Sequence, residues 1–150
     1  MTCAVVKTFA LQWDRPKRTR DVATNSTQGR EGMKIDISEL ANLDGFIGAC
    51  VVDSETALTL TKEQGHSGFD LDAAAAGNTE VVRAKHKAMK ALKLKDSIED
   101  ILITLGTQYH LIRPLAKTPS IFIYLALDKK SASLGMARVE LKKVEEFASV

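Results

Sequence analysis

The chain has 150 residues, a formal net charge of +2, and 45% hydrophobic and 27% charged side chains. These values are typical of one globular domain with a substantial core, and the small net charge argues against a nucleic-acid-binding groove. Two cysteines, Cys3 and Cys50, cannot build a disulfide framework, so we expect reduced thiols and a cytoplasmic protein. No apolar run approaches the roughly 18 residues that a membrane span needs.

Residues 1–32 differ in composition from the rest of the chain. They carry six basic and three acidic side chains, a net charge of +3, whereas residues 33–150 carry fifteen basic and sixteen acidic ones, a net charge of −1. Low hydrophobicity without any period cannot offset the entropy of ordering. We therefore predict that residues 1–32 are a disordered tail or a start-site extension, and that residues 33–150 form the folded domain.

The first patterned elements are a short helix and a hairpin. Asp36 and Glu39 have the spacing of a helix start, and Asp44-Gly45 ends that helix. Residues 46–52 are apolar at nearly every position, which predicts a buried strand. Asp53 begins a turn, and residues 57–61 alternate as a half-exposed strand.

Residues 70–94 form the longest helical pattern. Its apolar positions spread over an arc of roughly 180°, although a helix that covers one sheet face needs a stripe of only about 100°. The excess width predicts a second packing partner. Gly77 and the alanines at its flank favour close approach of another helix.

Three extended runs follow at residues 101–105, 109–115 and 121–127, separated by short turns. Such short connections predict an antiparallel meander, and the last run, apolar on both faces, must be covered on both faces. Ser131 or Ser133 then caps a final helix. The predicted fold class is α+β, with one five-stranded antiparallel sheet, helices on both faces, and the order α-β-β-α-β-β-β-α.

Candidate sites for chemistry are few. There is no glycine-rich nucleotide fingerprint, so we expect no bound GTP and no cofactor. His66, His86 and His110 lack Cys or carboxylate partners at metal spacing, and Cys50 lies in an apolar run without a base. We predict no metal site and no catalytic residue. Asp96, Glu99 and Asp100 form an acidic cluster that is expected to be a solvated strand entry.

Three strings resemble the Roadblock family, which comprises dynein light chains of that name and bacterial and archaeal regulators of Ras-like GTPases. They are residues 43–53 (LDGFIGACVVD), the alanine-rich helix that opens at Asp70, and residues 134–141 (LGMARVEL). The resemblance covers residues 36–150. The family usually has glycine in the turn after the strand's Asp, whereas this chain has Ser54-Glu55-Thr56, which leaves the turn type open.

The resemblance implies a homodimer in which the middle helix packs on its twin and the following strand pairs with its twin. The wide apolar arc and the apolar strand edge favour the same arrangement independently. The predicted dimer interface comprises Ala74, Val81, Ala84, Ala88, Ala91, Ile101 and Ile103.

By the same resemblance, a small Ras-like GTPase is expected to dock on the paired helices. The predicted partner-binding residues are Arg83, His86, Lys87 and Lys90. The predicted function is therefore a non-catalytic dimeric regulator or scaffold. Two alternatives remain: an assembly adaptor that makes no GTPase contact, and a small-ligand sensor, which needs a cavity with convergent polar groups.

Overall fold

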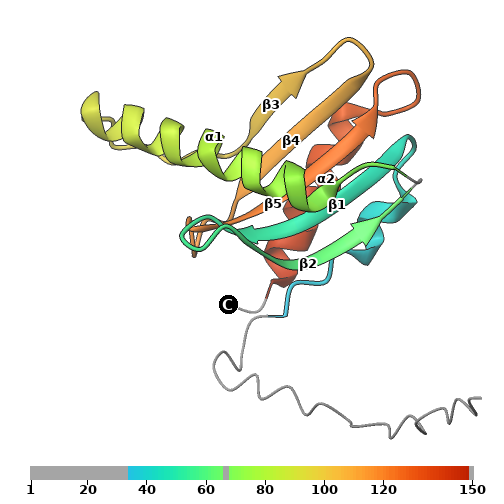
Figure 1. Ribbon diagram of the computed structural model, residues 1–150, viewed down its shortest axis with the longest axis horizontal. Coiled ribbons are helices and arrows are strands. Elements are labelled where there is room, and N and C mark those ends of the chain that lie inside the picture. Colours follow the sequence, from blue (N-terminus) through green and yellow to red (C-terminus); the bar gives the residue numbers. More distant parts are fainter. Residues whose placement is uncertain (1–33, 66–67, 149–150) are drawn as a thin grey trace, which may run out of the picture. The chain divides into compact units, whose positions relative to one another are not determined.

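Five strands form one antiparallel sheet in the order β2-β1-β5-β4-β3 in the computed structural model of the protein (Figure 1). The structure describes residues 34–65 and 68–148, so the predictions for residues 1–32 and His66 lie outside the described residues. The elements are η1 (Ser38–Asn42), β1 (Phe46–Asp53), β2 (Leu58–Gln64), α1 (Leu71–Ala91), β3 (Ile101–Thr104), β4 (Gln108–Pro114), β5 (Ile121–Asp128) and α2 (Leu134–Phe147). The predicted fold class and the meander of the last three strands are confirmed.

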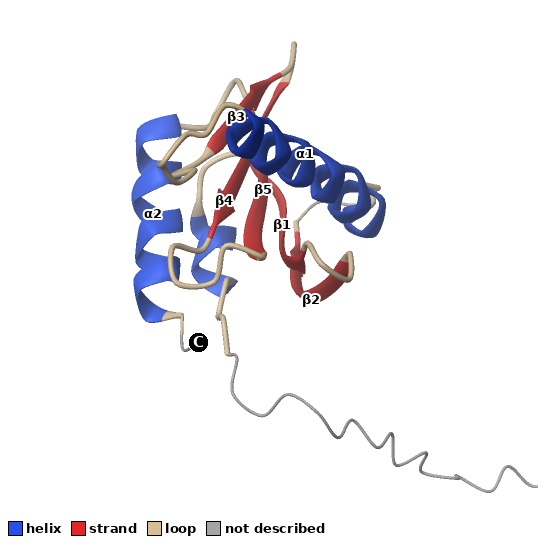
Figure 2. Ribbon diagram, turned by 90° about the vertical axis from the view of Figure 1, so that its left-hand side faces the viewer, coloured by secondary structure: helices blue, strands red, loops and turns tan. Residues whose placement is uncertain are grey.

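β5 lies at the centre of the sheet, between β1 and β4, and is buried on both faces. Its residues Ile121, Ile123, Leu125 and Leu127 pack with η1 and α2. Phe122, Tyr124 and Ala126 face α1. Figure 2 shows the sheet between the two long helices. The prediction that this apolar strand is covered on both faces is therefore confirmed.

The first predicted helix is a 3₁₀ helix, η1, and not an α-helix. Ile37 and Leu40 are both buried, and their spacing of three residues matches the threefold period of a 3₁₀ helix. The residue that precedes the helix is Ile37, which makes no side-chain capping bond, so the prediction of Asp36 as the cap is wrong. Asp36 stands one residue earlier and accepts a hydrogen bond from the Ser38 N–H at 2.9 Å. The chain turns into extended backbone at Leu43, which leaves too few residues for a full α-helix.

α1 begins where the sequence indicates and ends earlier than predicted. Asp70 caps it by accepting hydrogen bonds from the N–H groups of Asp72 and Ala73 at 3.1 and 2.9 Å. The helix ends at Ala91 rather than Leu94, because Lys93 adopts a left-handed conformation with φ of +54°. The Leu94 N–H then donates to the Met89 carbonyl, which is the bond of a Schellman stop.

Candidate partner-binding surface

The buried stripe of α1 is narrow and leaves much of the helix uncovered. Only Leu71, Ala75, Asn78, Thr79 and Val82 are buried against the sheet. The two polar members are satisfied within the helix, since the Asn78 amide donates to the Ala74 carbonyl at 2.8 Å and the Thr79 hydroxyl to that of Ala75 at 2.9 Å. The rest of the helix surface is available for contacts outside this fold.

None of the seven predicted dimer-interface residues is fully buried within the chain. Ala74 and Val81 are half-buried, and Ala84, Ala88 and Ala91 are exposed. At about 100° per residue, these five fall within an arc of about 100° beside the buried stripe. Gly77 lies in the same arc, and a Cβ atom placed there meets no atom within 4 Å. We call this set, Ala74, Gly77, Val81, Ala84, Ala88 and Ala91, the small-residue stripe.

β3 is one edge of the sheet and pairs only with β4 among the described residues. Ile101 and Ile103 are half-buried and pack against the cluster on the α1 side of the sheet. The predicted interface residues of β3 therefore face the same side of the sheet as α1. An apolar strand with one unpaired edge is a template for pairing with another strand.

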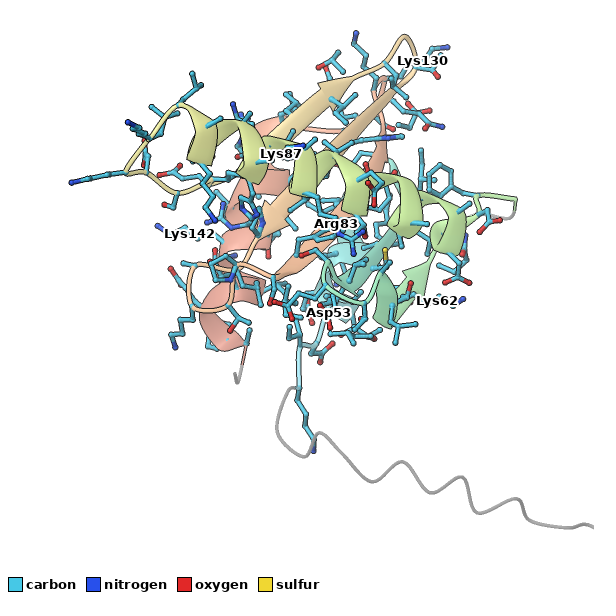
Figure 3. The ribbon with its side chains drawn as sticks, turned by 60° about the vertical axis from the view of Figure 1, so that its left-hand side comes forward. Asp53, Lys62, Arg83, Lys87, Lys130 and Lys142 are labelled. Carbon is cyan, nitrogen blue, oxygen red and sulfur yellow. The ribbon has the colours of Figure 1, made fainter. Side chains whose placement is uncertain are left out.

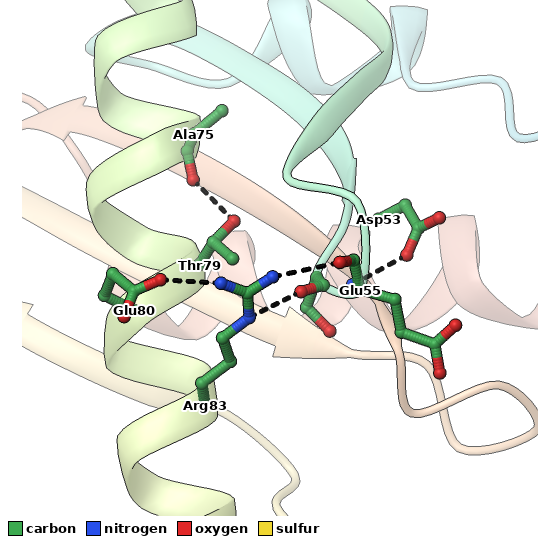
Figure 4. Close-up of polar contacts among 7 residues, drawn as sticks. Asp53, Glu55, Ala75, Thr79, Glu80 and Arg83 are labelled. Carbon is green, nitrogen blue, oxygen red and sulfur yellow. Dashed lines mark hydrogen bonds and ion pairs between the residues drawn. The ribbon is translucent and has the colours of Figure 1, made fainter.

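Arg83, one of the four predicted partner-binding residues, is engaged within the chain. Its Nε donates to the Ser54 carbonyl at 2.8 Å and its Nη2 to the Glu55 carbonyl at 3.0 Å. Its Nη1 pairs with Glu80 at 2.7 Å (Figure 4). The guanidinium thus fastens α1 to the turn between β1 and β2. This contact escaped the sequence, because 28 and 29 residues separate the partners and no local period marks such a pair.

The turn that Arg83 holds is built by Asp53, as the sequence predicted. The buried carboxylate accepts hydrogen bonds from the Glu55 N–H at 2.9 Å and the Thr56 hydroxyl at 3.0 Å. The left-handed position that glycine often fills is occupied by Ala57, with φ of +60°. Figure 3 shows Arg83 near this turn and Lys87 farther along the same helix.

The other three predicted partner-binding residues are more available than Arg83. Lys87 and Lys90 are exposed and His86 is half-buried. None of the three forms an ion pair with another residue in the ranges 34–65 and 68–148. At about 100° per residue, His86 and Lys90 lie opposite the small-residue stripe, whereas Lys87 lies about 40° from Ala91 at its margin. One helix therefore offers two adjoining surfaces.

A groove of about 900 Å³ lies between the end of α1, residues 96–100, the connection from β4 to β5, and α2. Four of its charged residues form two ion pairs. Arg138 holds Asp100 through two hydrogen bonds of 2.9 and 3.1 Å, and Arg113 meets Glu145 at 2.6 Å. The acidic cluster predicted to be solvated is thus partly engaged by α2. Because these side chains bind one another, fewer polar groups of the groove are free to bind a small ligand, as the sensor alternative requires.

Two titratable side chains buried in the sheet, Cys50 and Tyr124, have raised pKa values. Cys50 is fully buried, and burial raises the pKa of its thiol to about 12, so it stays protonated. Burial also raises the pKa of the Tyr124 phenol. Within the described residues, no group of three or more His, Cys, Asp and Glu side chains could hold a metal ion. The helices described here are also too short or too polar to cross a bilayer.

The fold is similar to solved structures of MglB and Roadblock domains. MglB of Myxococcus xanthus matches with a TM-score of 0.59 and 15% identity, over 71% of this chain and 80% of that one. A Roadblock/LC7 domain from Streptomyces avermitilis matches with 0.62 and 9%, over 73% and 88%. The gliding protein MglB from Thermus thermophilus matches with 0.60 and 16%, over 72% and 78%.

No protein-family model matches the sequence, and no curated protein matches it. Because the identities of these structural matches are low, the matches establish the fold alone. The chain has a Roadblock-type fold, and the resemblance drawn from its three sequence strings is confirmed at that level.

Proposed function

We propose that the chain is a non-catalytic homodimeric regulator or scaffold that binds a small Ras-like GTPase and changes its nucleotide cycle or its placement. The observation that carries the proposal is the position of two uncovered surfaces on one side of the sheet. The small-residue stripe of α1 and the residues Ile101 and Ile103 of β3 are both incompletely buried within the chain.

A two-fold axis can cover both surfaces with the same patch of a second copy. Alanine and glycine side chains let two helices approach closely, and helix axes in such contacts lie 8–10 Å apart. Pairing of β3 with its twin then removes an edge that is open within the described residues. Both contacts come from neighbouring parts of the molecule, so one interface satisfies them together.

The dimer is tested by light scattering of the full chain. We expect a mass of about twice 16.4 kDa. Ala88→Arg, in the small-residue stripe, should give a monomer, because the new charge would be buried against its twin. Ala76→Arg is the matched control: it is also exposed on α1 but lies about 120° away around the helix, and it should leave the dimer intact. A wild-type monomer at micromolar concentration contradicts the proposal.

The GTPase contact is assigned to Lys87 and Lys90 rather than Arg83, because Arg83 is engaged by the turn. The chain would act by binding the switch regions of the GTPase and biasing their conformations. The chain itself supplies no reacting group in this scheme.

We expect Lys87→Glu with Lys90→Glu to weaken binding of a Ras-like GTPase from the same genome at least tenfold. Lys117→Glu with Lys130→Glu makes the same charge change at exposed positions off α1 and should leave binding unchanged. Absence of wild-type binding, together with unchanged nucleotide turnover, removes the GTPase from the proposal and leaves the dimer.

An assembly adaptor without GTPase contact is the second candidate. The outer face of α2 supports it, because Met136, Val139 and Phe147 are 53%, 47% and 83% exposed. A dimer with an additional apolar surface on each copy can join two further proteins. Loss of partner capture in Val139→Ser, with the dimer and the GTPase assay unaffected, would favour this candidate.

A further inference from the structure

Positive charge in this domain is concentrated at one end of α1. Residues 83–95 contain Arg83 and five lysines and no acidic residue, a net charge of +6. Residues 33–150 together carry −1, so the rest of the domain carries −7. A domain that is nearly neutral overall therefore has a strongly basic end on a strongly acidic body. The basic end is expected to attract anionic surfaces over about a Debye length.

The last part of this segment, Lys90 to Lys95, protrudes from the fold, and we call it the basic tip. Figure 1 shows the end of α1 continuing past the edge of the sheet. The Schellman stop at Lys93 then turns the chain back. All three lysines of the tip are exposed, and none forms an ion pair with a residue that the structure describes.

Two leucines are exposed between these lysines. Leu92 is 68% and Leu94 51% exposed. Lysines near a helix C-terminus are explained by the helix dipole alone, which favours positive charge there. The dipole does not account for two large apolar side chains in water beside them. The combination of lysines with exposed leucines is typical of segments that lie on anionic membrane surfaces, where the charges meet phosphates and the apolar groups enter the acyl boundary.

We propose that the basic tip binds the phosphate-bearing surface of an anionic membrane, with Lys90, Lys93 and Lys95 contacting headgroups and Leu92 and Leu94 inserting below them. Nucleic acid offers phosphates but no apolar layer, so it would leave the leucines without a role. The cytoplasmic leaflet carries anionic lipids, which fits the predicted cytoplasmic setting. The membrane site shares Lys90 with the proposed GTPase contact, so its test changes only Lys93, Lys95, Leu92 and Leu94. Membrane binding there would determine where the dimer works.

The test is sedimentation of the full chain with vesicles. We expect binding to vesicles of phosphatidylcholine with about one-third phosphatidylserine, and none to pure phosphatidylcholine. Lys93→Gln with Lys95→Gln should lower the partition coefficient about 25-fold, because each lysine near such a surface contributes about fivefold. Leu92→Ser with Leu94→Ser should lower it about tenfold or more, although the charge is unchanged.

Lys117→Gln with Lys130→Gln is the matched control, with the same charge change at exposed positions that lie outside α1 (Lys130 is labelled in Figure 3). Circular dichroism of each variant checks that the fold is intact. The proposal is overturned if the wild type does not bind anionic vesicles, or if the tip variants bind as the control does, since another segment would then hold the lipid. It is also overturned if the leucine variant binds vesicles like the wild type while duplex DNA binds as tightly as the vesicles. A third contrary outcome is that the tip variants dissociate the dimer in light scattering without any change in lipid binding.

Discussion

The Nε of Arg83 lies 2.8 Å from the carbonyl oxygen of Ser54, so a side chain in the middle of α1 holds the turn between β1 and β2. The same turn is tied to the centre of the sheet, because the Ser54 hydroxyl donates to the Ser120 carbonyl at 2.7 Å. A substitution of Arg83 therefore changes the fold and the surface charge together. Lys87 and Lys90 are the cleaner probes of partner binding, since they have no comparable partner in the described residues.

Replacing Arg83 by Ala should lower the free energy of unfolding by about 1–2 kcal/mol, because two carbonyl groups lose a charged donor that is partly open to water. Arg83→Lys should cost nearly as much, since one ammonium group cannot reproduce the fork of the guanidinium. Urea unfolding measures both. Lys87→Ala serves as control and should change stability by less than about 0.5 kcal/mol; equal losses at the two positions would count against the Arg83 contact.

Ala57→Gly should stabilise the protein by about 1 kcal/mol. Ala57 has φ of +60°, a conformation that costs L-residues roughly 1–2 kcal/mol and glycine very little. The gain is reduced by the greater freedom of glycine in the unfolded chain. The same replacement at Ala76, inside α1, should instead destabilise by about 1 kcal/mol. Opposite signs in two thermal melts are the expected outcome, and a loss at both positions would contradict it.

Glu145→Gln should destabilise the protein by about 2 kcal/mol. One oxygen of Glu145 accepts from Arg113 at 2.6 Å and the other from the Ala116 N–H at 2.7 Å. The ion pair is 14% and 15% exposed at its two side chains, so its loss costs less than the 3–5 kcal/mol of a fully buried pair. The neighbouring Glu146→Gln, at an exposed position, should have almost no effect in the same denaturant titration. Similar losses in both variants would show that the pair contributes little.

Stability should fall as the pH drops below about 6.5, through His110. Burial lowers the pKa of His110 in the folded chain, so the unfolded chain binds the proton more readily. The free energy of unfolding therefore decreases from about pH 6.5 down to the folded-state pKa and then levels off with respect to this group. His110→Gln should remove that part of the slope, measured by denaturant titrations from pH 8 to pH 5 relative to His86→Gln. A wild-type slope that survives His110→Gln would assign it to other groups.

Several elements were predictable because their signals are local. The cap at Asp70, the turn at Asp53 and the coverage of β5 follow from neighbouring residues or from a run of apolar side chains. The errors were also local. The first helix stays a short 3₁₀ helix because the backbone becomes extended at Leu43, and α1 stops because Lys93 adopts a left-handed conformation. Neither position carries a glycine or proline that would have marked it in the sequence.

The amino-acid sequence by itself determined the five strands, the two covered faces of the sheet and the excess apolar width of the central helix. Hydrophobic periods of two and 3.6 residues can be read from residues that are close together in the chain. Only the tertiary structure decided that β5 lies between β1 and β4, that Arg83 fastens a turn 29 residues away, and that the basic tip projects past the sheet. Those relationships join distant parts of the chain, and they exist only once the long-range strand pairs have formed.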